Sequence, residues 1–120
     1  MGELLRLHLE GNQLGPLLPD LSLGMPKLSY VNLMLNEFSG DLNDLVIGKE
    51  VAYVNLYHNH ISSLNNADGK AVINFPYLVT LNISHNLIVD VPKLEYISMA
   101  KGSLLDATRN TFSVSSAGIE

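Results

Sequence analysis

The stretch Leu4-Leu5-Arg6-Leu7-His8-Leu9-Glu10-Gly11-Asn12-Gln13-Leu14 reads L-x-x-L-x-L-x-x-N-x-L, and the same pattern recurs along the chain. Three further copies fill these slots: Leu28, Val31, Leu33, Asn36 and Phe38; Val51, Val54, Leu56, Asn59 and Ile61; Leu78, Leu81, Ile83, Asn86 and Ile88. A weaker fifth copy has Leu105, Ala107, Asn110 and Phe112, with Gly102 in the first slot. The asparagines are 24, 23, 27 and 24 residues apart. A period of this length predicts a solenoid.

Each copy alternates apolar and polar residues around its second and third apolar slots, which is the periodicity of a β-strand. One such strand cannot bury its apolar face alone. Copies stacked ~4.8 Å apart form a parallel sheet over a continuous core. An asparagine amide offers two donors and an acceptor to the backbone where the chain leaves the strand. We therefore predict a structural ladder of asparagines through the array: Asn12, Asn36, Asn59, Asn86 and Asn110.

The five-slot pattern resembles the leucine-rich repeat. Asn36-Glu37-Phe38-Ser39-Gly40-Asp41-Leu42 is similar to the plant-type N-x-F-S-G-x-I/L segment, and Asn12-Gln13-Leu14-Gly15-Pro16-Leu17-Leu18-Pro19 to its N-x-L-S/T-G-x-I-P form. The resemblance implies an α/β solenoid: a right-handed curved coil with a parallel concave sheet of about five strands and irregular or 3-10 convex returns. We expect residues 1–120 to form one domain of about five repeats. It has no recognisable end caps, as in a fragment of a longer array.

The register after Asn86 has two solutions. Val91-Pro92-Lys93-Leu94 repeats the lead-in of Met25-Pro26-Lys27-Leu28, which would place the fifth strand at Leu94, Ile97 and Met99. The rival register, Leu105 to Phe112, keeps the coil length near that of the other copies, and Leu105-Asp106-Ala107-Thr108-Arg109-Asn110-Thr111-Phe112-Ser113 resembles the family's L-D-L-S-x-N-x-F-S. We prefer the second register, which puts Leu94 to Met99 on the convex side.

The composition of the chain excludes several classes of partner. The chain of 120 residues has a formal net charge of −5 and no basic run, which argues against nucleic-acid and anionic membrane partners. No apolar run approaches the ~20 residues of a membrane span, so we expect no membrane insertion by this segment. There are no cysteines to report the redox compartment.

No catalytic spacing is present, and we expect neither an enzyme nor a cofactor. His58 and His85 precede ladder asparagines, with His60 nearby; we expect a solvated edge rather than a zinc or copper site, because no carboxylate or cysteine completes a shell.

The outward strand positions form columns on the concave face. One column runs Arg6, Tyr30, Tyr53, Thr80 and Leu104; the next runs His8, Asn32, Asn55, Asn82 and Asp106; the third runs Glu10, Met34, Tyr57, Ser84 and Thr108. Tyrosines and a methionine at the centre of a surface resemble an interface core, although tyrosine also stabilises sheets by cross-strand stacking. The predicted ligand-binding residues are Tyr30, Asn32, Met34, Tyr53, Asn55, Tyr57 and Asn82.

Two further expectations concern single positions. We expect Asn55 to be exposed, so that Asn55→Ala costs little, and Lys49 on the convex side to be a silent control for binding. Asn82-Ile83-Ser84 is the one glycosylation sequon, which we read as chance in a repeat that often carries asparagine in this slot.

These features predict a non-catalytic module that binds a protein or peptide ligand on its concave face, next to neighbouring repeats of a longer array. By its plant-type resemblance the chain would belong to an extracellular receptor ectodomain. The alternative is an intracellular, cytoplasmic leucine-rich repeat scaffold or regulatory subunit.

Overall fold

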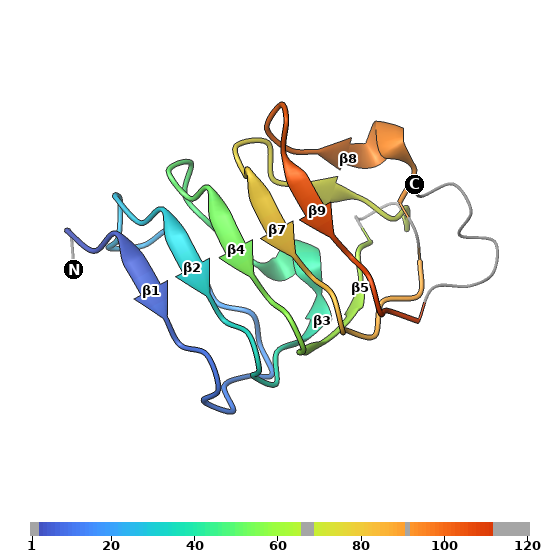
Figure 1. Ribbon diagram of the computed structural model, residues 1–120, viewed down its shortest axis with the longest axis horizontal. Coiled ribbons are helices and arrows are strands. Elements are labelled where there is room, and N and C mark those ends of the chain that lie inside the picture. Colours follow the sequence, from blue (N-terminus) through green and yellow to red (C-terminus); the bar gives the residue numbers. More distant parts are fainter. Residues whose placement is uncertain (1–2, 66–68, 91, 112–120) are drawn as a thin grey trace.

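The computed structural model describes residues 3–65, 69–90 and 92–111. Its largest sheet holds five short parallel strands in the order β1-β2-β4-β7-β9 (Figure 1). These strands are Arg6–His8, Tyr30–Asn32, Tyr53–Asn55, Thr80–Asn82 and Leu104–Asp106. We call the segments that begin at them the first to fifth coils. Every strand pairs with the strand of the next coil, so the chain winds as a parallel β-solenoid of about 4 turns.

The pairing register follows the columns that the repeat predicts. Arg6 lies beside Tyr30, Tyr30 beside Tyr53, Tyr53 beside Thr80, and Thr80 beside Leu104. The fifth strand is therefore built from Leu104–Asp106, which confirms the preferred register of the last copy. Leu94–Tyr96 forms the 3-10 helix η2, and Ile97–Ser98 forms β8, on the return side of the fourth coil. Phe112, the last residue of the fifth copy, lies outside the described residues.

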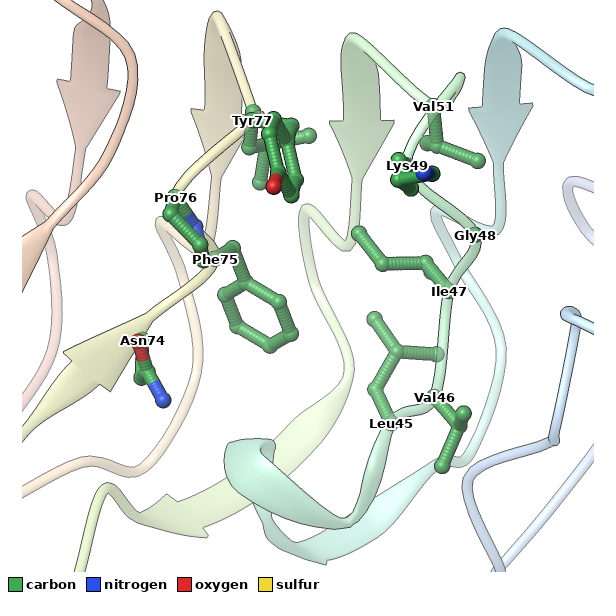
Figure 2. A pocket seen from close by; sticks show the side chains of 11 residues that line it. Leu45, Val46, Ile47, Gly48, Lys49, Val51, Asn74, Phe75, Pro76 and Tyr77 are labelled. Atoms are coloured by element: carbon green, nitrogen blue, oxygen red, sulfur yellow. The ribbon is translucent and has the colours of Figure 1, made fainter.

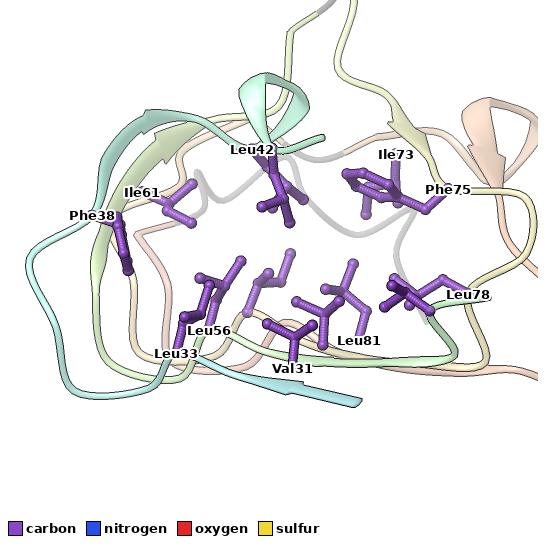
Figure 3. Packing of buried hydrophobic residues seen from close by; sticks show 14 of the residues in the cluster. Val31, Leu33, Phe38, Leu42, Leu56, Ile61, Ile73, Phe75, Leu78 and Leu81 are labelled. Atoms are coloured by element: carbon purple, nitrogen blue, oxygen red, sulfur yellow. The ribbon is translucent and has the colours of Figure 1, made fainter. Parts of the chain in front are cut away.

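The apolar slots of the repeat point into the coils and form one core (Figure 3). Val31, Val54 and Leu81, the middle residues of three neighbouring strands, are each 0% exposed. The returns cover the core from the other side with Leu42, Ile61 and Ile73. Apolar residues are thus buried at the same strand position in successive coils. A strand of three residues needs this burial to be stable, because no coil has a core of its own.

The returns contain short parallel pairings and single 3-10 turns. β3 (Ser39–Asp41) pairs with β5 (His60–Ser63), and β6 (Ile73–Asn74) pairs with β8. The 3-10 helix η1 (Leu42–Asp44) begins after Asp41, whose carboxylate accepts a hydrogen bond from the Asn43 N–H. That carboxylate also accepts from the Ser63 hydroxyl and the Asn65 N–H, both at 2.7 Å, and so joins the returns of the second and third coils.

Helix is almost absent. In the described ranges the two helices are η1 and η2, each a single 3-10 turn of 3 residues. The α/β class expected from the resemblance is therefore not what these residues form, because the returns pair with adjacent returns and satisfy their backbone in that way. No helix in the described part of the chain has the length and apolar character that crossing a bilayer requires.

Candidate functional site

Two tyrosines lie stacked at the centre of the outward side of the five-stranded sheet, which we call the sheet face. The rings of Tyr30 and Tyr53 are parallel to within 2°, and their centroids are 4.3 Å apart. His8 lies against the other side of Tyr30 at 4.9 Å, and the Arg6 guanidinium lies over the same ring at 4.9 Å. The parallel register of β1, β2 and β4 makes this stack, because it sets residues of one column side by side.

The hydroxyl of Tyr53 is partly withdrawn from water. Burial raises the pKa of Tyr53 above its ordinary value of 10.0, the hydrogen bond with Tyr30 raises this pKa further, and the hydrogen bond with Asn55 opposes the rise. The Asn55 Nδ2 lies 3.4 Å from the Tyr53 hydroxyl oxygen. Tyr53 is therefore neutral around pH 7 and presents a polar, uncharged tip beside the ring of Tyr30.

The asparagine column of the sheet face serves the fold. The Oδ1 of Asn55 accepts a hydrogen bond from the Tyr57 N–H at 2.9 Å, and the Oδ1 of Asn82 accepts from the Ser84 N–H at 2.9 Å and its hydroxyl at 2.6 Å. Asn32 holds the Met34 N–H in the same way at 3.2 Å. Each side chain thus closes a turn over the backbone two residues further on, where the chain leaves the strand.

This column corrects the expectation that Asn55 is exposed. Asn32 and Asn55 are each only 8% exposed, and the Asn55 amide lies against the Met34 sulfur and the Tyr53 hydroxyl. Their Oδ1 atoms are engaged with the backbone, which leaves little of either amide for a ligand. The sequence could have indicated the capping bond, since asparagine two residues before a turn commonly caps the backbone, but it gave no sign of the burial.

The third column brings a second group of rings together beyond the ends of the strands. The Tyr57 ring meets His85 edge to face at 4.9 Å, and His58 and His85 are stacked with centroids 6.1 Å apart. The sulfur of Met34, in the same column as Tyr57, lies 3.5 Å from the Asn55 Nδ2. His58 and His85 are thus neighbours, as the repeat predicts. Within the described residues no set of three or more His, Cys, Asp or Glu side chains is placed to hold a metal ion.

The predicted ladder asparagines join successive coils through the backbone. The Nδ2 of Asn59 donates to the carbonyl oxygens of Leu56 in its own coil and Leu33 in the coil before, at 3.2 and 3.0 Å. Its Oδ1 accepts from the Phe38 N–H at 3.1 Å. Asn36, Asn86 and Asn110 repeat this arrangement. Asn59 is 2% exposed, so these bonds satisfy groups that water does not reach.

The pattern did not predict the left-handed backbone conformation of the residue just before each ladder asparagine. Leu35, His58, His85 and Arg109 all have φ between 55° and 58°, and Gly11 has φ 72°. The left-handed conformation turns the chain so that the asparagine side chain points back into the coil. Glycine in the first copy was the one clue, because only glycine adopts this conformation without steric cost.

A pocket lies on the return side, between the second and third coils (Figure 2). Its volume is about 270 Å³, and it is lined by residues 45–49 and 74–78 together with Val51. Leu45 and Ile47 point across the gap toward Phe75 (Figure 2). Lys49 and Tyr77, which is 60% exposed, stand at its rim. Lys49, which we expected to be a silent control for binding at the sheet face, thus lies beside this pocket.

The pocket coincides with a break in backbone pairing. Val46 bridges to Asp20 of the first coil, whereas Ile73 pairs with Ile97 of the fourth coil. Within the described residues no pairing joins the segment around Val46 to β6. Successive residues of a paired strand direct their backbone groups to opposite neighbours, so the N–H and C=O of Ile47 and Asn74 face the break. The pocket thus combines an apolar floor with strand edges.

No protein-family model, curated protein or solved structure matches this chain.

Proposed function

We propose that the chain is a non-catalytic, leucine-rich repeat module that binds a protein or peptide through the sheet face. The observation that carries this proposal is the stack of Tyr30 on Tyr53, flanked by Arg6 and His8. Rings that are already ordered by their neighbours lose little conformational entropy when a ligand binds, and tyrosine offers both apolar surface and a hydroxyl.

The hydrogen bonds of the asparagines divide the predicted binding residues into two groups. Tyr30, Tyr53, Tyr57 and Met34 are half-buried and still reach the surface. Asn32, Asn55 and Asn82 support the turns beneath these side chains, and we assign them that role rather than direct contact with a ligand. The ligand we propose is an extended peptide segment with an apolar or aromatic side chain. Such a segment fits a shallow row of rings better than it would fit a deep pocket.

The test is selection of binders from a random-peptide display library on the wild-type chain, followed by affinity measurements on the variants Tyr53→Ala and Tyr57→Ala. Each substitution should cost about 2 kcal/mol or more, a loss of about thirtyfold in affinity. The matched control is Tyr96→Ala, which removes a half-buried tyrosine from η2 on the return side. Binders that tolerate both sheet-face substitutions would show that the proposal is wrong.

The return pocket is the second candidate for the same kind of ligand. Its apolar floor, and the lack of pairing within the described residues between the segment around Val46 and β6, suit an extended segment that adds a strand and inserts one apolar side chain. Val46→Lys, at a position 43% exposed on the pocket wall, separates the two surfaces. Peptides that lose affinity with Val46→Lys and not with Tyr53→Ala would assign binding to the pocket.

The plant-type resemblance supports placing this module in an extracellular receptor ectodomain, and an intracellular scaffold or regulatory subunit is the alternative. The flanking parts of the gene distinguish these settings. A signal peptide encoded upstream and a membrane helix encoded downstream would establish the receptor. A parent gene that encodes neither would favour the scaffold.

A further inference from the structure

Charged residues are divided unevenly between the sheet face and the rest of the sequence. The chain has 7 lysines and arginines and 12 aspartates and glutamates. Both arginines, Arg6 and Arg109, lie on the sheet face or at its border, together with two acidic residues, Glu10 and Asp106. All lysines and the remaining ten acidic residues belong to other positions. With histidine neutral, the sheet face therefore has no net formal charge, although the chain as a whole has −5.

A row of residues just before the ladder asparagines borders the sheet face. The Tyr57 ring lies 4.9 Å from His85 and 5.9 Å from His58, between ring centroids. The His85 N–H donates to the Thr108 carbonyl at 3.0 Å, and His85 and Arg109 share the left-handed backbone conformation. Arg109 therefore occupies in the fifth coil the position that His85 occupies in the fourth. The border thus carries two imidazoles and a guanidinium in successive coils.

The carboxylates of the sheet face already have partners. The Glu10 Oε2 lies 3.6 Å from the His8 Nδ1. The Asp106 Oδ1 accepts hydrogen bonds from the hydroxyl and the N–H of the threonine two residues further on, at 2.7 and 3.1 Å. In the part of the chain that the structure describes, neither Arg6 nor Arg109 forms an ion pair with a carboxylate. Both guanidinium groups are exposed, so a carboxylate from outside the chain can reach them.

The ring stack also positions a cation. The Arg6 guanidinium carbon lies over the Tyr30 ring at 4.9 Å from its centroid, and Tyr30 is stacked on Tyr53. A guanidinium that lies over a ring still has N–H donors along its edge, and arginine offers these donors to a carboxylate in pairs. The apolar centre of the sheet face and a carboxylate-binding group are therefore adjacent.

We infer that the ligand of the sheet face is an acidic peptide segment. It places an aromatic or apolar side chain on the Tyr30–Tyr53 stack and carboxylates on both sides of it, one at Arg6 and one at Arg109. This inference rests on the proposed function and adds the charge of the ligand. Four coil spacings of ~4.8 Å separate the first coil from the fifth by about 20 Å. An extended segment of about six or seven residues spans this distance.

Charge complementarity is the reason for choosing an acidic segment. The chain has a net charge of −5, so most of its surface repels acidic peptides, whereas the sheet face and its border present two guanidinium groups. Complementary charge steers a ligand to one surface and fixes its register there, while the rings supply the buried apolar contact.

The experiment begins with peptides selected from a random display library on the wild-type chain. Those that lose affinity with Tyr53→Ala bind the sheet face, and we expect them to carry aspartate or glutamate on both sides of an aromatic or apolar residue. One such peptide is then compared with its neutral analogue, in which asparagine or glutamine replaces each acidic residue. We expect each replacement to weaken binding about two- to fivefold at low salt, measured by fluorescence anisotropy.

The matching protein variants are Arg6→Gln and Arg109→Gln. Each should weaken binding of the acidic peptide about two- to fivefold at low salt, and high salt should remove most of the difference. The matched control is Lys93→Gln, which removes the same charge from an exposed residue on the return side and should leave affinity unchanged. The variant with both arginine substitutions should bind the acidic peptide and its neutral analogue equally, because the groups that distinguish them are gone.

The outcomes separate this inference from the proposed function. Peptides that depend on Tyr53 and carry no acidic residues would overturn the inference and leave the proposed function standing. So would a neutral analogue that binds the wild-type chain as tightly as the acidic peptide does. A loss with Lys93→Gln as large as with the arginine variants would show that only net charge matters, which also overturns it. Selection that yields no Tyr53-dependent peptide would contradict the proposed function and this inference together.

Discussion

The Nδ2 of Asn86 donates a hydrogen bond to the Leu56 carbonyl at 2.9 Å, across the junction between the fourth and third coils. The Asn86 Oδ1 accepts from the Ile61 N–H of the same earlier coil at 2.9 Å. One buried amide thus holds both a donor and an acceptor of the neighbouring turn. Removing it takes the acceptor from the Ile61 N–H and leaves the Leu56 carbonyl with the Asn59 amide alone, at 3.2 Å, in a place that water does not reach.

We therefore expect Asn86→Ala and Asn59→Ala each to lower the free energy of unfolding by about 1–3 kcal/mol, the cost of unpaired buried polar groups. Asn74→Ala is the matched control, because this asparagine is exposed on β6 and should change stability by about 0.5 kcal/mol or less. Urea denaturation followed by circular dichroism compares the three variants. Equal losses at Asn59 and Asn74 would refute a structural ladder.

Asn55→Ala should also destabilise the fold, contrary to the expectation from its outward position. The substitution removes the acceptor for the Tyr57 N–H and opens a space beside the Tyr53 hydroxyl, so we expect a loss of about 1 kcal/mol. Asn55→Asp keeps an acceptor at this position, as Asp106 does for the Thr108 N–H at 3.1 Å. The aspartate variant should melt closer to wild type, and an alanine variant as stable as wild type would dismiss the capping role.

At Leu35, glycine should be more stable than alanine, which reverses the usual order. The φ of 58° costs any residue with a Cβ about 1–2 kcal/mol, and glycine escapes this cost. Comparing Leu35→Gly with Leu35→Ala isolates the backbone effect, because both variants lose the leucine side chain. Thermal unfolding should favour the glycine variant by about 1 kcal/mol once the larger entropy of its unfolded chain is included. Alanine as the more stable variant would contradict the left-handed turn.

Gly15→Ala should be severely destabilising, whereas Gly48→Ala should be tolerated. A Cβ at Gly15 would overlap the backbone carbonyl of Glu37 in the next coil, and its φ of 137° also disfavours other residues. A Cβ at Gly48 meets no atom within 4 Å. The expected loss at Gly15 is about 3 kcal/mol or more, because backbone must move to relieve the overlap. Similar denaturation midpoints for the two variants would show that the first two coils are not this close.

Stability should fall above pH 10 in a way that depends on Tyr53. The pKa of Tyr53 is raised in the folded chain, mainly by burial and then by its hydrogen bond with Tyr30, so the folded state binds this proton more tightly than the unfolded state does. The stabilisation is complete below the ordinary pKa of about 10 and is lost as pH rises through the raised value. Urea midpoints measured on both sides of this range should fall less for Tyr53→Phe than for wild type. An identical fall in both proteins would contradict the raised pKa.

Much of this fold follows from local pattern. The spacing of the asparagines predicts a solenoid, and alternation around Val31, Val54 and Leu81 predicts which strand residues face the core. Because strands that repeat in register must stack column on column, the neighbours Tyr30 and Tyr53, and His58 and His85, could be named in advance. These features follow from the chain geometry of a single repeat, because every coil has the same geometry.

Contacts between coils decided the rest. Asn55 lies on the outward face by alternation but is covered by side chains of Met34 and Tyr53, and no one-repeat pattern reports that burial. The pocket beside Phe75 exists because the returns of the second and third coils pair with different neighbours, a property of four coils together. The α/β class was wrong for the same reason: the returns are held by pairing to adjacent returns and do not need a helix to satisfy their backbone.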